Sequence, residues 1–127
     1  MIKMQFTDVC LFSENVRKLA DFYEKLFDIK VDGDDVHCFV NASGLGIAIY
    51  SKTAAENEMN FDLSGCGRGL SYIGFNCEDA DTEYQRIRTL NICNPTEPKV
   101  WPWGAKSFHF KDIDGNLIVV RSWPKEK

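Results

Sequence analysis

Apolar and polar residues alternate along this chain in two patterns, and the changes between them mark its predicted elements. The first segment, from Phe6 to Phe12, is rich in β-forming residues and predicts a strand. After Ser13 the apolar spacing becomes three or four residues, which is typical of an amphipathic helix, with Asn15 as its N-cap. The apolar face of this helix comprises Val16, Leu19, Ala20, Tyr23, Leu26 and Phe27. We therefore predict a strand followed by a helix that covers one face of a sheet.

Turn-forming residues divide the rest of the first half into short strands. The segment from Asp32 to Asp35 predicts a turn. Two strands, Val36 to Val40 and Leu45 to Tyr50, are expected to be joined through Asn41 to Gly44. The unit has the order βαβββ if Asp28 to Val31 also forms a strand.

A long connection separates the two halves of the chain. The segment from Ser51 to Gly69 has few periodic apolar residues and several Asn and Gly residues. Because a structureless segment of this length is uncommon within a compact domain, it is either a functional loop or a boundary between modules. We place the first module at about 1–52, the connection at about 53–68 and the second module at about 69–124, within one domain spanning 1–127.

The second half repeats the order of elements of the first half. Asp8 to Asn15 aligns with Tyr72 to Asp79, 64 positions later, and both segments predict a strand, an N-cap and a helix. Val36 to Tyr50 aligns with Ser107 to Arg121, 71 positions later, so an insertion falls near Pro95 to Trp103. Self-similarity of this kind indicates a duplicated supersecondary unit.

Composition limits the classes of partner. The chain has 127 residues, a formal net charge of −4 and no run of Lys or Arg longer than two, so nucleic acid and membrane are not expected partners. Its five cysteines are an odd number without a CxxC pair, which favours free thiols and a cytoplasmic location. We expect one soluble globular domain.

Three short motifs resemble one known family. Phe110 to Asn116, with the sequence FKDIDGN, is similar to the F-x-D-P-D-G-N turn of the vicinal oxygen chelate superfamily, with Ile113 in place of proline. This superfamily includes glyoxalases, bleomycin resistance proteins and extradiol dioxygenases. Phe22 to Leu26 resembles the family's first-helix pattern, and Trp103-Gly104 resembles a W-G that often precedes its penultimate strand. The resemblance covers nearly the whole chain.

The resemblance implies an α+β fold. Two βαβββ modules are expected to pair their mostly antiparallel sheets into a half-open barrel around a central cavity, with the helices outside. Strand alternation then divides the residues between two faces. The residues expected to pack under the helices are Val9, Leu11, Ile73, Phe75, Ile118 and Val120. The residues expected to face the cavity are Asp8, Cys10, Phe12, Tyr72, Gly74, Asn76, Ser107, His109, Val119 and Arg121.

The resemblance also implies where a metal would be bound. Metal-using members carry His, Gln or Glu at four equivalent points, which correspond here to Asp8, Ala48, Tyr72 and Val119. Ala and Val cannot bind a metal, and a neutral Tyr is a poor ligand for a divalent ion. We therefore expect no metal and no cofactor. A register slip of one residue would exchange the faces and leave His37 and His109 as the available imidazoles.

A pocket with aromatic walls and a few polar points suits a planar or amphipathic ligand held by stacking. The candidate ligand-binding residues are Asp8, Tyr72, Trp101, Trp103, Ser107, His109 and Arg121. Several alternatives stay open: the two tryptophans contact ligand or pack over the barrel end, and His109 is a site residue or a half-buried imidazole. Arg121 pairs with Asp8, holds an anionic group or is a surface residue. Asp8 and His109 could also act as an acid and base pair.

These observations favour a metal-independent protein that binds or sequesters an aromatic or amphipathic compound, as bleomycin resistance proteins do with their antibiotic. The alternative is an enzyme: a glyoxalase-type lyase, isomerase or dioxygenase with a non-standard or metal-dependent site, or a metal-free hydrolase or isomerase. A third possibility is an interaction module with a shrunken pocket. The resemblance also implies a homodimer.

Overall fold

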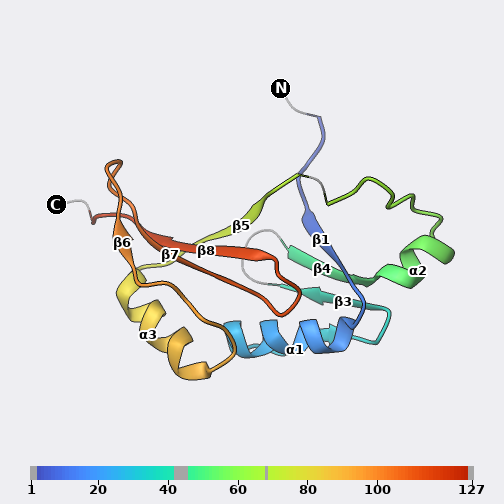
Figure 1. The fold of residues 1–127 in the computed structure, drawn as a ribbon, viewed down its shortest axis with the longest axis horizontal. Coiled ribbons are helices and arrows are strands. Elements are labelled where there is room, and N and C mark those ends of the chain that lie inside the picture. The colour runs from blue at the N-terminus through green and yellow to red at the C-terminus, as the bar shows by residue number, and fades with distance from the viewer. Residues whose placement is uncertain (1–2, 42–45, 68, 126–127) are drawn as a thin grey trace. The chain divides into compact units, whose positions relative to one another are not determined.

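The chain forms two compact units, each with its own sheet (Figure 1). A computed structural model of the protein describes residues 3–41, 46–67 and 69–125. The first unit spans Met1–Cys66 and the second spans Gly67–Lys127.

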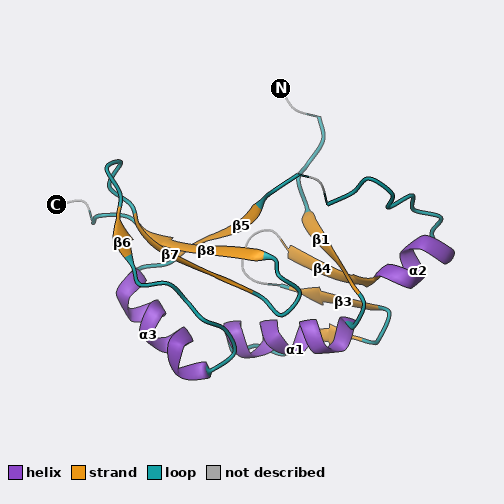
Figure 2. Ribbon diagram, in the orientation of Figure 1, coloured by secondary structure: helices purple, strands orange, loops and turns teal. Residues whose placement is uncertain are grey.

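The first unit is a four-stranded mixed sheet with two helices (Figure 2). The strands lie in the order β1-β4-β3-β2, in which β1 is parallel to β4 and the other neighbours are antiparallel. Its elements are β1 (Asp8–Ser13), α1 (Val16–Phe27), β2 (Asp32–Gly33), β3 (His37–Val40), β4 (Gly46–Ser51) and α2 (Lys52–Asn57).

The second unit repeats this topology. Its strands lie in the order β5-β8-β7-β6, with β5 parallel to β8 and the other neighbours antiparallel. The elements are β5 (Tyr72–Asn76), α3 (Ala80–Leu90), β6 (Lys99–Val100), β7 (Lys106–Lys111) and β8 (Leu117–Ser122). The first strands begin 64 residues apart and the last strands begin 71 residues apart, as the repeat predicts. The predicted α+β fold of two βαβββ modules with mostly antiparallel sheets is confirmed.

The second strand of the first unit was predicted in the wrong place. The backbone of Asp28 is left-handed, with φ of 54°, and its N–H bonds to the Glu24 carbonyl as a helix C-cap, so Asp28 to Val31 is not a strand. Instead Asp32 pairs with Phe39, inside the segment predicted to be a turn. The predicted connection through Asn41 to Gly44 lies, from residue 42 on, outside the described residues.

The composition of the connection between the halves suggested a segment without regular structure, but the segment contains a helix. Helix α2 begins directly after β4, where the Ser51 hydroxyl caps it by accepting the Ala54 N–H at 3.2 Å. Ala54 and Ala55 are its buried residues. Two adjacent alanines make no visible periodic stripe, and for this reason the apolar pattern did not reveal the helix.

Each long helix packs on the face of its own sheet. Helix α1 contacts β1, β3 and β4, and helix α3 contacts β7 and β8. The predicted helix-facing residues Ile118 and Val120 are buried, whereas Val9, also predicted to pack under a helix, is 36% exposed near the start of β1. Among the described residues, no helix combines the length and apolar composition of a membrane span. All five cysteines are free thiols, as predicted.

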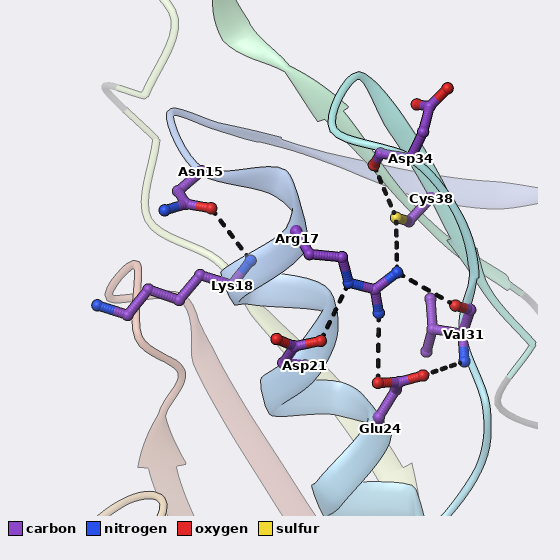
Figure 3. Close-up of polar contacts among 8 residues, drawn as sticks. All are labelled: Asn15, Arg17, Lys18, Asp21, Glu24, Val31, Asp34 and Cys38. Carbon is purple, nitrogen blue, oxygen red and sulfur yellow. Dashed lines mark hydrogen bonds and ion pairs between the residues drawn. The ribbon is translucent and has the colours of Figure 1, made fainter.

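A polar network joins α1 to the chain that follows it (Figure 3). The Arg17 guanidinium pairs with Asp21 at 3.0 Å and with Glu24 at 3.3 Å on its own helix. It also donates to the Val31 carbonyl at 3.4 Å, and the Glu24 carboxylate accepts the Val31 N–H at 2.7 Å. These bonds hold the segment before β2 against the helix, which brings Asp32 to the edge of the sheet.

The start of α1 gives a direct test of local structure. The Asn15 side chain accepts the Lys18 N–H at 3.1 Å, as predicted for an N-cap. We expect Asn15→Ala to lower the free energy of unfolding by about 1 kcal/mol, because this N–H loses its partner. Asn15→Asp, which keeps an acceptor at the same place, is the control and is expected to retain wild-type stability. Urea denaturation followed by circular dichroism measures both; equal midpoints for Asn15→Ala and wild type would contradict the prediction.

Candidate functional site

The second unit contains a pocket of about 210 Å³ on one face of its sheet. Phe108 and Phe110 of β7 and Ile118 and Val120 of β8 are buried on the α3 side, where Tyr84 of the helix contacts Phe108. Because side chains alternate along a strand, the residues between them lie on the opposite face. The residues that line the pocket there are Tyr72, Trp101, Trp103, Ala105, Ser107, His109, Val119 and Arg121.

Strand register brings these side chains together. Val119 of β8 lies between Gly74 of β5 and His109 of β7. Arg121, two residues further along β8, lies between Asn76 and Ser107. Residues paired in this way share a face of the sheet. His109 pairs with Val119, and Tyr72 lies two residues before Gly74 on β5, so both residues are on the face of the sheet that carries the pocket.

Two tryptophans form the aromatic part of the wall. The rings of Trp101 and Trp103 are stacked, with centroids 5.4 Å apart and planes inclined by 3°. The Trp101 indole N–H donates to the Ser107 hydroxyl at 2.7 Å, and the Lys99 ammonium lies 4.6 Å from the centroid of the Trp101 ring. Since Trp101 is held by these contacts while Trp103 is 66% exposed, Trp103 offers a free ring surface beside a fixed one.

His109 is oriented by a residue outside the predicted set. The Thr96 hydroxyl accepts the backbone N–H of His109 at 3.0 Å and lies 3.5 Å from Nδ1 of the imidazole. The contact between the hydroxyl and Nδ1 can run in either direction, according to which ring nitrogen carries the proton. Thr96 therefore orients the imidazole, and Nε2 of His109 can take part in a hydrogen bond at the pocket.

The side chain of Arg121 extends from β8 towards Tyr72 and Gly74 of β5. Its guanidinium carbon is 5.9 Å from the centroid of the Tyr72 ring. A Cβ atom at Gly74 would stand 2.2 Å from Nη2 of Arg121, so the absence of a side chain at Gly74 makes room for the guanidinium. Nε of Arg121 is buried and has no hydrogen-bond partner among the described residues.

Six of the seven candidate residues line this pocket, and Asp8 does not. Asp8 is the first residue of β1 in the first unit, where its carboxylate accepts a hydrogen bond from the Thr7 hydroxyl at 2.6 Å. Sequence reasoning missed Thr96, because its contact with His109 crosses 13 positions without a repeat to indicate it. Ala105 also lines the pocket, and a lone apolar residue gives no signal in the sequence.

Residues 5–120 match the model of the Glyoxalase/Bleomycin resistance protein/Dioxygenase superfamily. The chain belongs to this superfamily. No sequence among the curated proteins matches the chain. The resemblance found in the turn from Phe110 to Asn116 is thus confirmed over most of the chain.

Several solved structures share the fold. A glyoxalase/bleomycin resistance protein/dioxygenase from Nocardioides has a TM-score of 0.80 at 17% identity, over 100% of this chain and 88% of that one. A family enzyme from Burkholderia phytofirmans PsJN has a TM-score of 0.79 at 12% identity, over 95% of this chain and all of the other. Lactoylglutathione lyase from Agrobacterium tumefaciens has a TM-score of 0.72 at 16% identity, over 93% and 92%. At such identities the likeness shows the fold alone.

The metal of the superfamily does not fit the residues at its four expected points. Asp8 begins β1 and Tyr72 begins β5, while Ala48 and Val119 are each the third residue of the last strand of their sheet. Each module therefore offers at most one oxygen donor, and a divalent ion needs several. Within residues 3–41, 46–67 and 69–125, no three His, Cys, Asp or Glu side chains gather as a metal site.

Proposed function

We propose that this protein is a metal-independent binding protein that holds a small aromatic or amphipathic compound in the pocket of its second unit. The observation that carries the proposal is the pocket wall, in which the stacked Trp101 and Trp103 lie beside Tyr72, Val119 and a few polar groups. Apolar and aromatic walls with a small number of fixed polar groups are typical of small-molecule sites. The volume of about 210 Å³ is below the roughly 300–1,000 Å³ of drug-sized pockets, which favours a ligand of one or two rings.

Tryptophan fluorescence and calorimetry test the proposal together. We expect one- and two-ring aromatic compounds to quench the emission of the wild-type protein at saturable, micromolar concentrations. Trp103→Ala is expected to weaken binding about tenfold, since a stacking contact with an exposed ring contributes about 1 kcal/mol or more. Trp123→Ala is the matched control, because it removes a tryptophan that is 50% exposed and does not line the pocket. An equal loss of affinity in both variants would contradict the proposal.

Metal analysis tests the metal-independent part separately. Protein purified without chelator or nickel resin is expected to contain far less than one equivalent of zinc, nickel, iron or manganese per chain. Near-stoichiometric metal would contradict the proposal and would point to ligands other than the four equivalent residues.

A glyoxalase-type lyase or isomerase is the second candidate. The structural likeness to lactoylglutathione lyase favours it, although at 16% identity that likeness concerns the fold. Burial raises the pKa of the thiols of Cys10, Cys77 and Cys93, and a nearby carboxylate adds to this for Cys10 (Asp8) and Cys77 (Glu83), so these cysteines are weak nucleophiles at neutral pH. If the protein turned over a glyoxalase-type substrate and a chelator abolished that turnover, the result would favour the enzyme.

The homodimer, the cytoplasmic location and a role in antibiotic resistance stay predictions.

A further inference from the structure

The positive charge in the pocket has no partner within its own unit. Among the described residues of the second unit, no hydrogen bond or ion pair engages the Arg121 guanidinium, which lies 5.9 Å from the centroid of the Tyr72 ring. The side chain is half-buried and its Nε is shielded from solvent. Because a charge that gives up hydration needs a counter-charge, this arginine is costly unless an anion is bound beside it.

We propose that the ligand is an aromatic monocarboxylate whose carboxylate is held by Arg121 and whose ring lies against the pocket's aromatic wall. This inference rests on the proposed function and specifies its ligand. A planar guanidinium binds a carboxylate through two parallel N–H donors, which also fixes the ring in one orientation.

The charge balance of the pocket favours one negative charge. Arg121 is the only Arg or Lys among the residues that line it, and Lys99 lies over Trp101 without lining the pocket. A phosphate or dicarboxylate would bring two charges to one cation and leave one of them uncompensated.

The position of Gly74 also supports a role for the Arg121 guanidinium in the pocket. The guanidinium occupies the space that any side chain at position 74 would take, with Nη2 only 2.2 Å from the position of a Cβ atom. Adding a methyl group there must displace the flexible end of Arg121. Gly74→Ala therefore moves the charge without removing it.

Calorimetric titration with 2-naphthoate and its neutral analogue 2-naphthamide tests the inference. Wild type is expected to bind naphthoate at least tenfold more tightly than naphthamide. Arg121→Gln is expected to weaken naphthoate binding by about tenfold to a hundredfold, the range for a hydrogen bond to a charged group, and to leave naphthamide binding within twofold. Gly74→Ala should weaken naphthoate in the same direction. Arg88→Gln on α3 and Gly69→Ala, which has open space around it, are the matched controls.

The outcomes separate this inference from the proposed function. Equal affinity for naphthoate and naphthamide leaves the binding protein in place and overturns the carboxylate. Binding of neither probe overturns both. A third arm uses Asp8→Asn: if Asp8 is the counter-charge of Arg121, this variant binds naphthoate at least tenfold more tightly than wild type, and that result overturns the inference. Unchanged naphthoate affinity in Asp8→Asn supports it. Thermal unfolding of every variant shows that each one is folded.

Discussion

Phe108→Ala is expected to lower the free energy of unfolding by about 3–5 kcal/mol, the largest effect that we predict for a single substitution. Phe108 of β7 is 1% exposed, and the centroid of its ring lies 5.7 Å from that of Tyr84 on α3 and 6.2 Å from that of Phe110. Truncation removes the buried ring and leaves a cavity that the two neighbouring rings cannot fill. Urea denaturation followed by circular dichroism measures the loss.

A phenylalanine outside the core provides the control. Phe6 is 62% exposed, so Phe6→Ala changes the same side chain without opening a cavity and is expected to alter stability by no more than about 0.5 kcal/mol. A loss below about 1 kcal/mol for Phe108→Ala would show that this strand does not pack on α3 as described.

Asp112→Ala is expected to destabilise the protein by about 2–3 kcal/mol, because it removes the acceptor on which the last turn of the second unit depends. Asp112 is 5% exposed, and Oδ1 accepts the backbone N–H groups of Asp114 and Asn116, each at 2.9 Å. Oδ2 accepts the Asn116 side-chain amide at 2.9 Å. Alanine leaves all three donors without this partner.

The neighbouring aspartate separates this effect from a change of charge. Asp114 is exposed, and Asp114→Ala removes the same negative charge from the same turn with an expected change within about 0.5 kcal/mol. Asp112→Asn keeps one acceptor oxygen but loses the charge, and we expect it to lower the free energy of unfolding by an intermediate amount. Equal losses for Asp112→Ala and Asp114→Ala would show that net charge, rather than the hydrogen bonds of the turn, sets the stability.

Elements whose signal is local were predictable from the sequence. Helix α1 begins at Val16 and ends at Phe27, the limits of the apolar stripe, because an N-cap and a helical period depend on residues only three or four positions apart. The closing turn was predictable for the same reason. Its aspartate bonds to residues two and four positions ahead, and Gly115 takes a positive φ of 88°.

Elements that depend on a distant partner were not. The two residues of β2 form a strand only because Asp32 and Gly33 pair with Phe39 and Cys38, and two residues carry no period. The left-handed cap at Asp28 moved this strand four positions from where it was expected. Helix α2, with two buried alanines, had too small an apolar face to be seen.

The sequence by itself determined the family and the order of elements in the duplicated module, since repeats and strand alternation carry register over long distances. The expectation that no metal is bound also came from the sequence, because it needs only the chemistry of Ala48 and Val119 at positions that the resemblance implies, and it stays a prediction. Only the tertiary structure decided how the pocket is built. The room that Gly74 leaves for Arg121, the bond from Thr96 to His109 and the unpaired Nε are contacts between separate strands and loops. Such contacts depend on packing distances that no spacing along the chain encodes.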